Sequence, residues 1–125
     1  MKKMILIVCF MPFLLASTCE SDPIDDVVCT TQAFAGLQVK VSLQNGNLPN
    51  PSGVIVIARD DNYSETLREI GMVHTDFVGA YERKGTYIIT VSKNGYKTYT
   101  SNSIVVEADR CHVSTQQINV VLQPE

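Results

Sequence analysis

Hydrophobic and polar residues alternate with a period of two along much of the chain after residue 35. The segment 37–43 places Leu37, Val39 and Val41 on one side and polar residues on the other, which predicts a strand with one buried face. The segment 86–92 has the same pattern. The unbroken β-branched run 54–58 predicts a central strand buried on both faces. Further strands are expected at 72–77, 96–100, 104–107 and 113–122.

Turn-forming residues separate these segments. Asn94 and Gly95 predict a tight hairpin turn with positive φ at both central residues. The segment 78–81 reads as a connection, and 63–70 suits either one helical turn or a strand. No segment of the sequence has a pattern that requires a helix. The pattern predicts an all-β protein, an antiparallel β-sandwich of about seven strands.

The first residues have a different pattern. Lys2 and Lys3 precede an apolar run over 4–15, which is shorter than the ~20 apolar residues that a membrane-spanning helix needs. Small residues then lead to Cys19, as in a bacterial lipoprotein leader. We therefore expect residues 1–18 to be a signal peptide and Cys19 to carry lipid. Cleavage by an ordinary signal peptidase, which would leave Cys19 as a free thiol, is the alternative.

The cysteines fit an oxidising compartment. Of the four, Cys9 would leave with the leader and Cys19 would be lipidated, so Cys29 and Cys111 remain as a pair. An even pair outside the cytoplasm predicts a disulfide, and two buried thiols that never meet are the alternative. No metal site is expected, because neither cysteine lies in a C-x-x-C and His112 directly follows Cys111.

The charge balance limits the partners. Without Lys2 and Lys3 the chain holds 8 basic and 13 acidic residues, a net charge of −5, which argues against nucleic acid as a partner. The acidic start of the mature chain predicts a solvated tether over 19–28, followed by one domain over 29–125. A calcium site would need Asp22, Asp25 and Asp26, whose spacing does not match a calcium loop. No cofactor is expected.

The segment 82–97 carries a resemblance. Its order of a glycine, a tyrosine two residues later, alternating apolar residues, a turn and a Gly-Tyr pair is similar to carboxypeptidase regulatory-like domains. The matching residues are Gly85, Tyr87, Ile89, Val91, Gly95 and Tyr96. Those domains are transthyretin-like β-sandwiches, so the resemblance, which covers roughly 35–122, implies this fold for the chain. The segment 46–53 only approximates the glycine- and proline-containing turn that family members often have before the second strand.

The sequence contains few residues in a context that suggests catalysis. His74 and Asp76 would share one face of a strand, but Ser64, Thr75 and Ser92 lack the sequence context of an activated nucleophile. We therefore expect no enzyme. The expected function is a membrane-anchored lipoprotein, with the outer membrane favoured because Glu20 is not the aspartate that retains lipoproteins at the inner membrane. Its sandwich would bind an envelope protein or polymer, or serve as an accessory subunit.

A carbohydrate- or small-ligand-binding module is the alternative function. It would bind by stacking on aromatic side chains at the sandwich edge. The residues that would carry it are Tyr63, Tyr81, Tyr96 and Tyr99.

Overall fold

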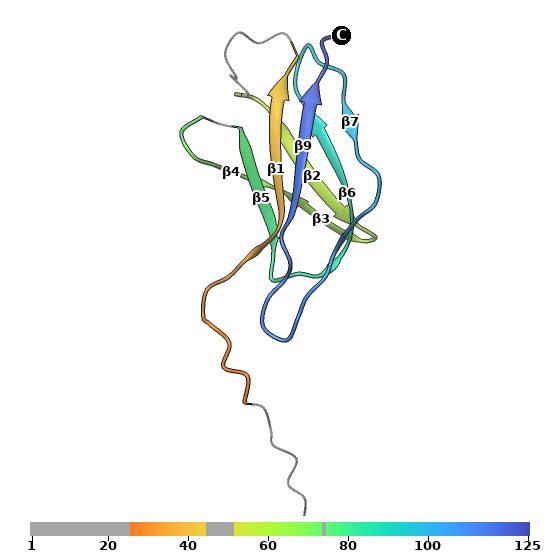
Figure 1. The fold of residues 1–125 in the computed structure, drawn as a ribbon. Helices are drawn as coiled ribbons and strands as arrows, with labels where there is room; N and C mark the ends of the chain where they lie inside the picture. The colour runs from red at the N-terminus through yellow and green to blue at the C-terminus, as the bar shows by residue number, and fades with distance from the viewer. Residues whose placement is uncertain (1–25, 45–51, 74) are drawn as a thin grey trace, which may run out of the picture.

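The computed structural model describes residues 26–44, 52–73 and 75–125. Within these ranges the chain forms nine strands, with the order and course shown in Figure 1. They are β1 (Ala35–Leu43), β2 (Ile55–Asp60), β3 (Tyr63–Thr66), β4 (Arg68–Ile70), β5 (Asp76–Tyr81), β6 (Gly85–Ser92), β7 (Tyr99–Thr100), β8 (Ile104–Val106) and β9 (Gln116–Leu122). No helix among these residues is long and apolar enough to cross a membrane.

The strands form two sheets, as expected for a β-sandwich. One sheet has the order β4-β5-β1-β9, and the other has the order β3-β2-β6-β7 with β8 also paired to β6. All pairs are antiparallel except β1 and β9, which run parallel from Leu37 opposite Gln116 to Leu43 opposite Leu122. The chain enters from residues 26–34 at one end, here called the base, where the β5–β6 and β8–β9 connections also lie (Figure 1).

The core lies between the sheets and follows the predicted alternation. Leu37, Val39 and Val41 of β1 are fully buried, and Tyr87 and Ile89 of β6 face them from the other sheet with no exposed surface. Each large apolar side chain taken out of water contributes about 1.5–3 kcal/mol. The other fully or nearly fully buried members include Val56, Ala58, Phe77, Ala80, Val91, Val106, Val120 and Leu122.

The strand β2 is buried on one face only, whereas the sequence predicted burial on both faces. Val56 and Ala58 of β2 are buried, but Ile55 at the start of the strand is 51% exposed and Ile57 is only half-buried. The prediction over 54–58 was wrong because β-branched residues favour any strand, whichever face is covered. In a two-layer sandwich each sheet has one face on the core, so the second face of β2 stays open.

The segment 63–81 differs most from expectation. Residues 63–70 are two short strands, and the chain changes sheets at Leu67, whose N–H donates to the carbonyl of Val56. The predicted strand 72–77 begins only at Asp76, and the predicted connection 78–81 is instead the second part of β5. Gly79 resembles a turn residue, although it lies inside this strand, where a Cβ would be in tight contact, 3.0 Å from both Glu65 Oε1 and Leu67 Cγ.

The turns and strand ends also needed correction. Only Gly95 of the β6–β7 turn has positive φ, whereas Asn94 does not. The hairpin arm expected at 96–100 is reduced to β7, because Tyr96 bridges to Pro124 instead. The expected strands 104–107 and 113–122 are β8 and β9, each slightly shorter than predicted.

Gly36 of β1 marks a point where the two sheets approach closely. A Cβ there would lie 2.8 Å from the Ala80 carbonyl oxygen and 2.9 Å from Val106 Cγ1, so backbone would have to move. We predict that Gly36→Ala lowers the free energy of unfolding by about 1–3 kcal/mol, as overpacking does. Lys40→Ala, on the exposed side of the same strand, should change it by less than about 0.5 kcal/mol. Urea unfolding followed by circular dichroism measures both, and equal effects would contradict the close approach.

Candidate functional site

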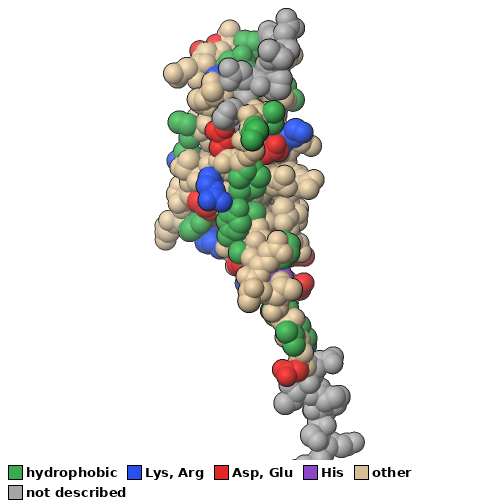
Figure 2. Space-filling model, turned by 90° about the vertical axis from the view of Figure 1, so that its left-hand side faces the viewer, with side chains coloured by type: hydrophobic (Ala, Val, Ile, Leu, Met, Phe, Trp, Pro, Cys, Tyr) green, Lys and Arg blue, Asp and Glu red, His purple; other side chains and the backbone are tan. Residues whose placement is uncertain are grey.

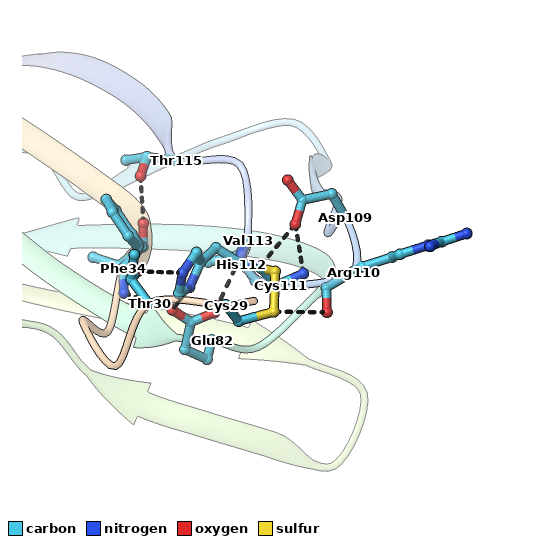
Figure 3. Close-up of polar contacts among 11 residues, drawn as sticks. Cys29, Thr30, Phe34, Glu82, Asp109, Arg110, Cys111, His112, Val113 and Thr115 are labelled. Atoms are coloured by element: carbon cyan, nitrogen blue, oxygen red, sulfur yellow. Dashed lines mark hydrogen bonds and ion pairs between the residues drawn. A yellow bond between two sulfur atoms is a disulfide. The ribbon is translucent and has the colours of Figure 1, made fainter. Parts of the chain in front are cut away.

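A disulfide joins the incoming chain to the base of the sandwich. Cys29 and Cys111 are bonded across a sequence separation of 82 residues, with their Cα atoms 5.2 Å apart. This confirms the predicted pair. Cys29 precedes β1, and Cys111 lies in the connection from β8 to β9, so the bond ties two loops at the same end (Figure 3). In the chain-entropy model, closing a loop of this length stabilises the fold by roughly 4 kcal/mol.

The residue after each cysteine continues the attachment. Thr30 Oγ1 lies 2.8 Å from His112 Nε2, and His112 Nδ1 lies 2.8 Å from Glu82 Oε1. The Phe34 ring also packs on the His112 ring, with centroids 4.7 Å apart. With Nδ1 donating to the carboxylate, Nε2 of the neutral imidazole accepts a hydrogen bond from the Thr30 hydroxyl. Thr30, His112 and Glu82 therefore form one hydrogen-bonded chain.

Glu82 is the acceptor on which this arrangement converges. Its carboxylate accepts the Phe34 N–H at 2.7 Å and the Val113 N–H at 3.2 Å, besides the hydrogen bond from His112. These donors, the Phe34 N–H first and His112 second, hold the pKa of Glu82 below its usual value. Glu82 thus joins the incoming chain to the end of the β8–β9 connection, just before β9.

Asp109 shapes the loop that carries Cys111. Its Oδ1 accepts the N–H groups of Cys111 at 2.7 Å and His112 at 2.8 Å, and its own N–H donates to the His112 carbonyl at 3.0 Å. The His112 N–H, and next the Cys111 N–H, lower the pKa of the Asp109 carboxyl. A compact turn results, which turns the disulfide and the imidazole toward the incoming chain (Figure 3). We call this set the base clamp: Cys29, Thr30, Phe34, Glu82, Asp109, Cys111 and His112.

The base clamp has the order of groups found in hydrolase triads: hydroxyl, imidazole, carboxylate. Catalysis of acyl transfer also needs N–H donors aimed at a developing oxyanion. Three backbone N–H groups of this loop are already engaged, since those of Cys111 and His112 donate to Asp109 and that of Val113 donates to Glu82. Those three N–H groups are therefore part of the hydrogen bonding within the base clamp.

A second polar network lies where β2, β3 and β6 meet the β5–β6 connection. Arg83 Nη1 donates to Asp60 Oδ2 at 2.8 Å and to the Tyr87 hydroxyl at 2.7 Å, and the guanidinium lies 3.8 Å above the Tyr63 ring centre. The buried Tyr87 hydroxyl donates in turn to the Arg83 carbonyl at 3.0 Å. This bond from a buried tyrosine to backbone four residues earlier closes a sandwich corner. The Gly-x-Tyr order fits this corner. Tyr87 closes it, and a Cβ on Gly85 would overlap Asp60 Oδ2.

Glu65 extends this second network to the other sheet. Its Oε2 accepts the Tyr63 hydroxyl at 2.7 Å and the Ala80 N–H at 2.8 Å, where Ala80 has a φ of 53°. The hydrogen bond to Glu65, together with burial, raises the pKa of Tyr63 to about 12. The network therefore stabilises the unusual backbone at Ala80 from across the sandwich.

The structure does not bring the four candidate tyrosines onto one platform. Tyr63 lies half-buried under Arg83. Tyr81 is 44% exposed at the base end of β5. Tyr96 and Tyr99 pack partly against the core and line two different hollows of about 380 and 300 Å³.

Several predicted residues fall outside the described part of the chain. These are the leader 1–18, the lipidation site Cys19, Asp22, Asp25 and His74. Of their expected partners, Asp26 is exposed and Asp76 accepts the hydroxyl of Thr75 at 3.0 Å. No cluster of three or more possible metal ligands occurs among the described residues.

Sequence reasoning missed Thr30 and Glu82. Their contacts with His112 span 82 and 30 residues, so no local pattern shows them. One signal was present: Thr30 and His112 each directly follow a cysteine of the predicted disulfide.

A scan against protein-family models finds no family that matches this chain, and a search of curated proteins finds no similar one.

The depressed pKa of Glu82 predicts a pH dependence of stability. A carboxyl whose pKa is lower in the folded state contributes stability above its unfolded pKa, near 4.5, and loses it as pH falls through the folded value. We expect Glu82→Gln to lower the free energy of unfolding at neutral pH and to differ progressively less from wild type below pH 4.5. Urea unfolding at several pH values measures this.

The matched control is Glu107→Gln, at an exposed position at the start of the β8–β9 connection. It should leave the unfolding free energy close to wild type at every pH, because its side chain has no partner in the base clamp. A Glu82→Gln deficit that stays constant on acidification would contradict the assignment of the carboxylate as the acceptor that holds the incoming chain.

Proposed function

We propose that this chain is a non-catalytic, lipid-anchored protein of the bacterial cell envelope, whose β-sandwich is a binding or structural accessory module. The partner would be an envelope protein or polymer, and nucleic acid is not among the expected partners. The membrane is reached through lipid on Cys19, with the outer membrane favoured over the inner. No cofactor takes part.

The base clamp is the observation that carries this proposal. A disulfide and the Thr30–His112–Glu82 hydrogen bonds attach the chain to the sandwich directly after the expected tether. Such an attachment is useful if the preceding chain is anchored at another site, because tension on the tether would otherwise pull β1 out of the sheet. A lipid at Cys19 would be such a hold, and a disulfide is stable only in an oxidising compartment.

The carboxypeptidase regulatory-like assignment is part of the proposal. Two of the residues on which the resemblance rests have clear structural roles: Tyr87 closes a sandwich corner and Gly85 makes room for Asp60. Ile89 and Val91 lie in the core with Tyr87. These roles support the family's packing pattern in this chain and say nothing about a ligand.

Carbohydrate binding has less support. The four tyrosines are distributed between the side of the sandwich, the base and two separate hollows, and Tyr63 is already stacked on Arg83. The alternative function required these tyrosines to act together as a stacking platform, and the structure does not bring them together. We therefore do not propose a glycan site.

The lipid anchor is tested by Cys19→Ala in the full chain. We expect this variant to leave the membrane fraction and to lack the mass of the lipid, because the acylated thiol is gone. Cys9→Ala is the matched control: its cysteine lies inside the expected leader, so the mature protein should be unchanged and membrane-bound. Membrane retention of Cys19→Ala with the same mature mass would refute the anchor.

The non-catalytic assignment is tested at Thr30. Thr30→Val removes the hydroxyl and keeps the shape of the side chain. We expect wild-type protein to hydrolyse an activated ester such as p-nitrophenyl acetate no faster than this variant, because the neighbouring N–H groups are engaged. A burst of product in the wild type, absent from Thr30→Val and accompanied by acyl-Thr30 in the mass spectrum, would show that the triad is catalytic.

A further inference from the structure

The turn between β6 and β7 contains an asparagine followed by a glycine. The Tyr96 N–H donates to the Lys93 carbonyl at 3.1 Å across this turn, and Gly95 has a φ of 80°. These are features of a type II turn, whose third residue needs positive φ and is therefore usually glycine. Among the asparagines that the structure describes, Asn94 alone precedes a glycine.

The side-chain amide of Asn94 and the backbone N–H of Gly95 are both open to water. The two residues are exposed, and within the described ranges no hydrogen bond engages either group. A Cβ built on Gly95 would meet no atom beyond its chain neighbours within 4 Å. Both residues also line a hollow of about 380 Å³. Neither packing nor hydrogen bonding therefore keeps the Gly95 nitrogen away from the Asn94 side chain.

The turn lies at the end of the sandwich opposite the base, beside the segment that follows β9 (Figure 1). The incoming chain leaves the molecule at the other end, which is the lower end in Figure 2. Neither the base clamp nor an anchor on the incoming chain would therefore cover this turn.

We propose that Asn94 is a site of spontaneous covalent modification, where its amide is converted to aspartate and isoaspartate through a cyclic imide. The Gly95 nitrogen loses its proton and attacks Asn94 Cγ, which closes a succinimide ring. The bond from Cγ to Nδ2 breaks, and Nδ2 takes up a proton and leaves as ammonia. Glycine favours this step because it has no side chain to hinder the attacking nitrogen.

Water then opens the ring at one of its two carbonyls. Attack at Cγ breaks the new bond and leaves an ordinary aspartate. Attack at the backbone carbonyl breaks the original peptide bond to Gly95, so the chain continues through the former side chain as isoaspartate. Both routes replace a neutral amide by a carboxylate, but only isoaspartate adds a methylene group to the backbone.

The isoaspartate form changes the contacts between this turn and the segment after β9. The Gly95 carbonyl accepts the Glu125 N–H at 3.1 Å, and the Lys97 N–H donates to the Gln123 carbonyl at 2.8 Å. An extra backbone atom before Gly95 lengthens the turn, so these donors and acceptors lose their alignment. The modification therefore loosens the segment after β9 from the turn.

The experiment is peptide mapping of the full chain after incubation in mildly alkaline and in mildly acidic buffer. Pepsin digestion at low pH limits further reaction, and electron-transfer fragmentation distinguishes isoaspartate from aspartate. We expect the Asn94 peptide to gain the mass of an amide-to-acid conversion, with isoaspartate among the products. The gain should be faster in the alkaline buffer, because the attacking nitrogen must lose its proton. Hydrogen exchange at the Lys97 N–H should be faster in the converted protein.

Asn102 is the internal control, because it is also exposed but precedes Ser103, whose side chain hinders ring closure. Its peptide should keep the amide mass over the same time. Asn94→Gln is the control variant: its amide carbon lies one methylene further along the side chain, and the larger ring closes far more slowly. Asn45 and Gly46 lie outside the described residues, and their peptide is scored separately.

Three results would overturn the proposal. The Asn94 peptide would keep its amide mass in alkaline buffer, Asn102 would convert equally fast, or aspartate would form at position 94 without isoaspartate, as in direct hydrolysis. Unchanged hydrogen exchange at Lys97 in the converted protein would contradict the loosening of the segment after β9.

Discussion

The disulfide between Cys29 and Cys111 is the constraint around which the sandwich is arranged. It joins the chain just before β1 to the chain just before β9. Those two strands are parallel neighbours, and parallel neighbours must both start at the same end of the sheet. The bond therefore holds together the starting points of a pair that is separated by seven other strands in sequence. Loop closure over such a distance is costly for the unfolded chain, and the covalent link removes much of that cost.

The carboxylate of Glu82 extends the same constraint without a covalent bond. It accepts hydrogen bonds from Phe34 before β1 and from His112 and Val113 before β9. Glu65 has an analogous position at the side of the sandwich, where it joins β3 to the Ala80 N–H of β5. In both places a carboxylate satisfies backbone N–H groups that no strand pairing covers, and unpaired donors of this kind are costly when buried. The two sheets are thus joined by polar contacts at their margins and by apolar packing between them.

The sequence predicted the fold class and the core but little of the base clamp. Period-two alternation is a local property, so the buried rows of β1, β6 and β9 could be assigned directly. The second part of β5, residues 78–81, was predicted as a connection because Gly79, which packs closely against Leu67 and Glu65, resembles a turn residue. The contact of Thr30 with His112 could not be predicted from the sequence, because it depends on which loops meet at the base. Only the disulfide pairing, deduced from counting cysteines, pointed to that end of the molecule.

The parallel return of β9 also determines which edge stays open. Among the described strands β9 pairs with β1 alone, and the segment after the β6–β7 turn lies beside its end, where Lys97, Tyr99 and Val121 line one hollow. The base clamp fixes where β9 starts, and the pairs of Tyr96 with Pro124 and of Lys97 with Gln123 fix where it ends. Between these fixed ends the strand has a defined register and direction.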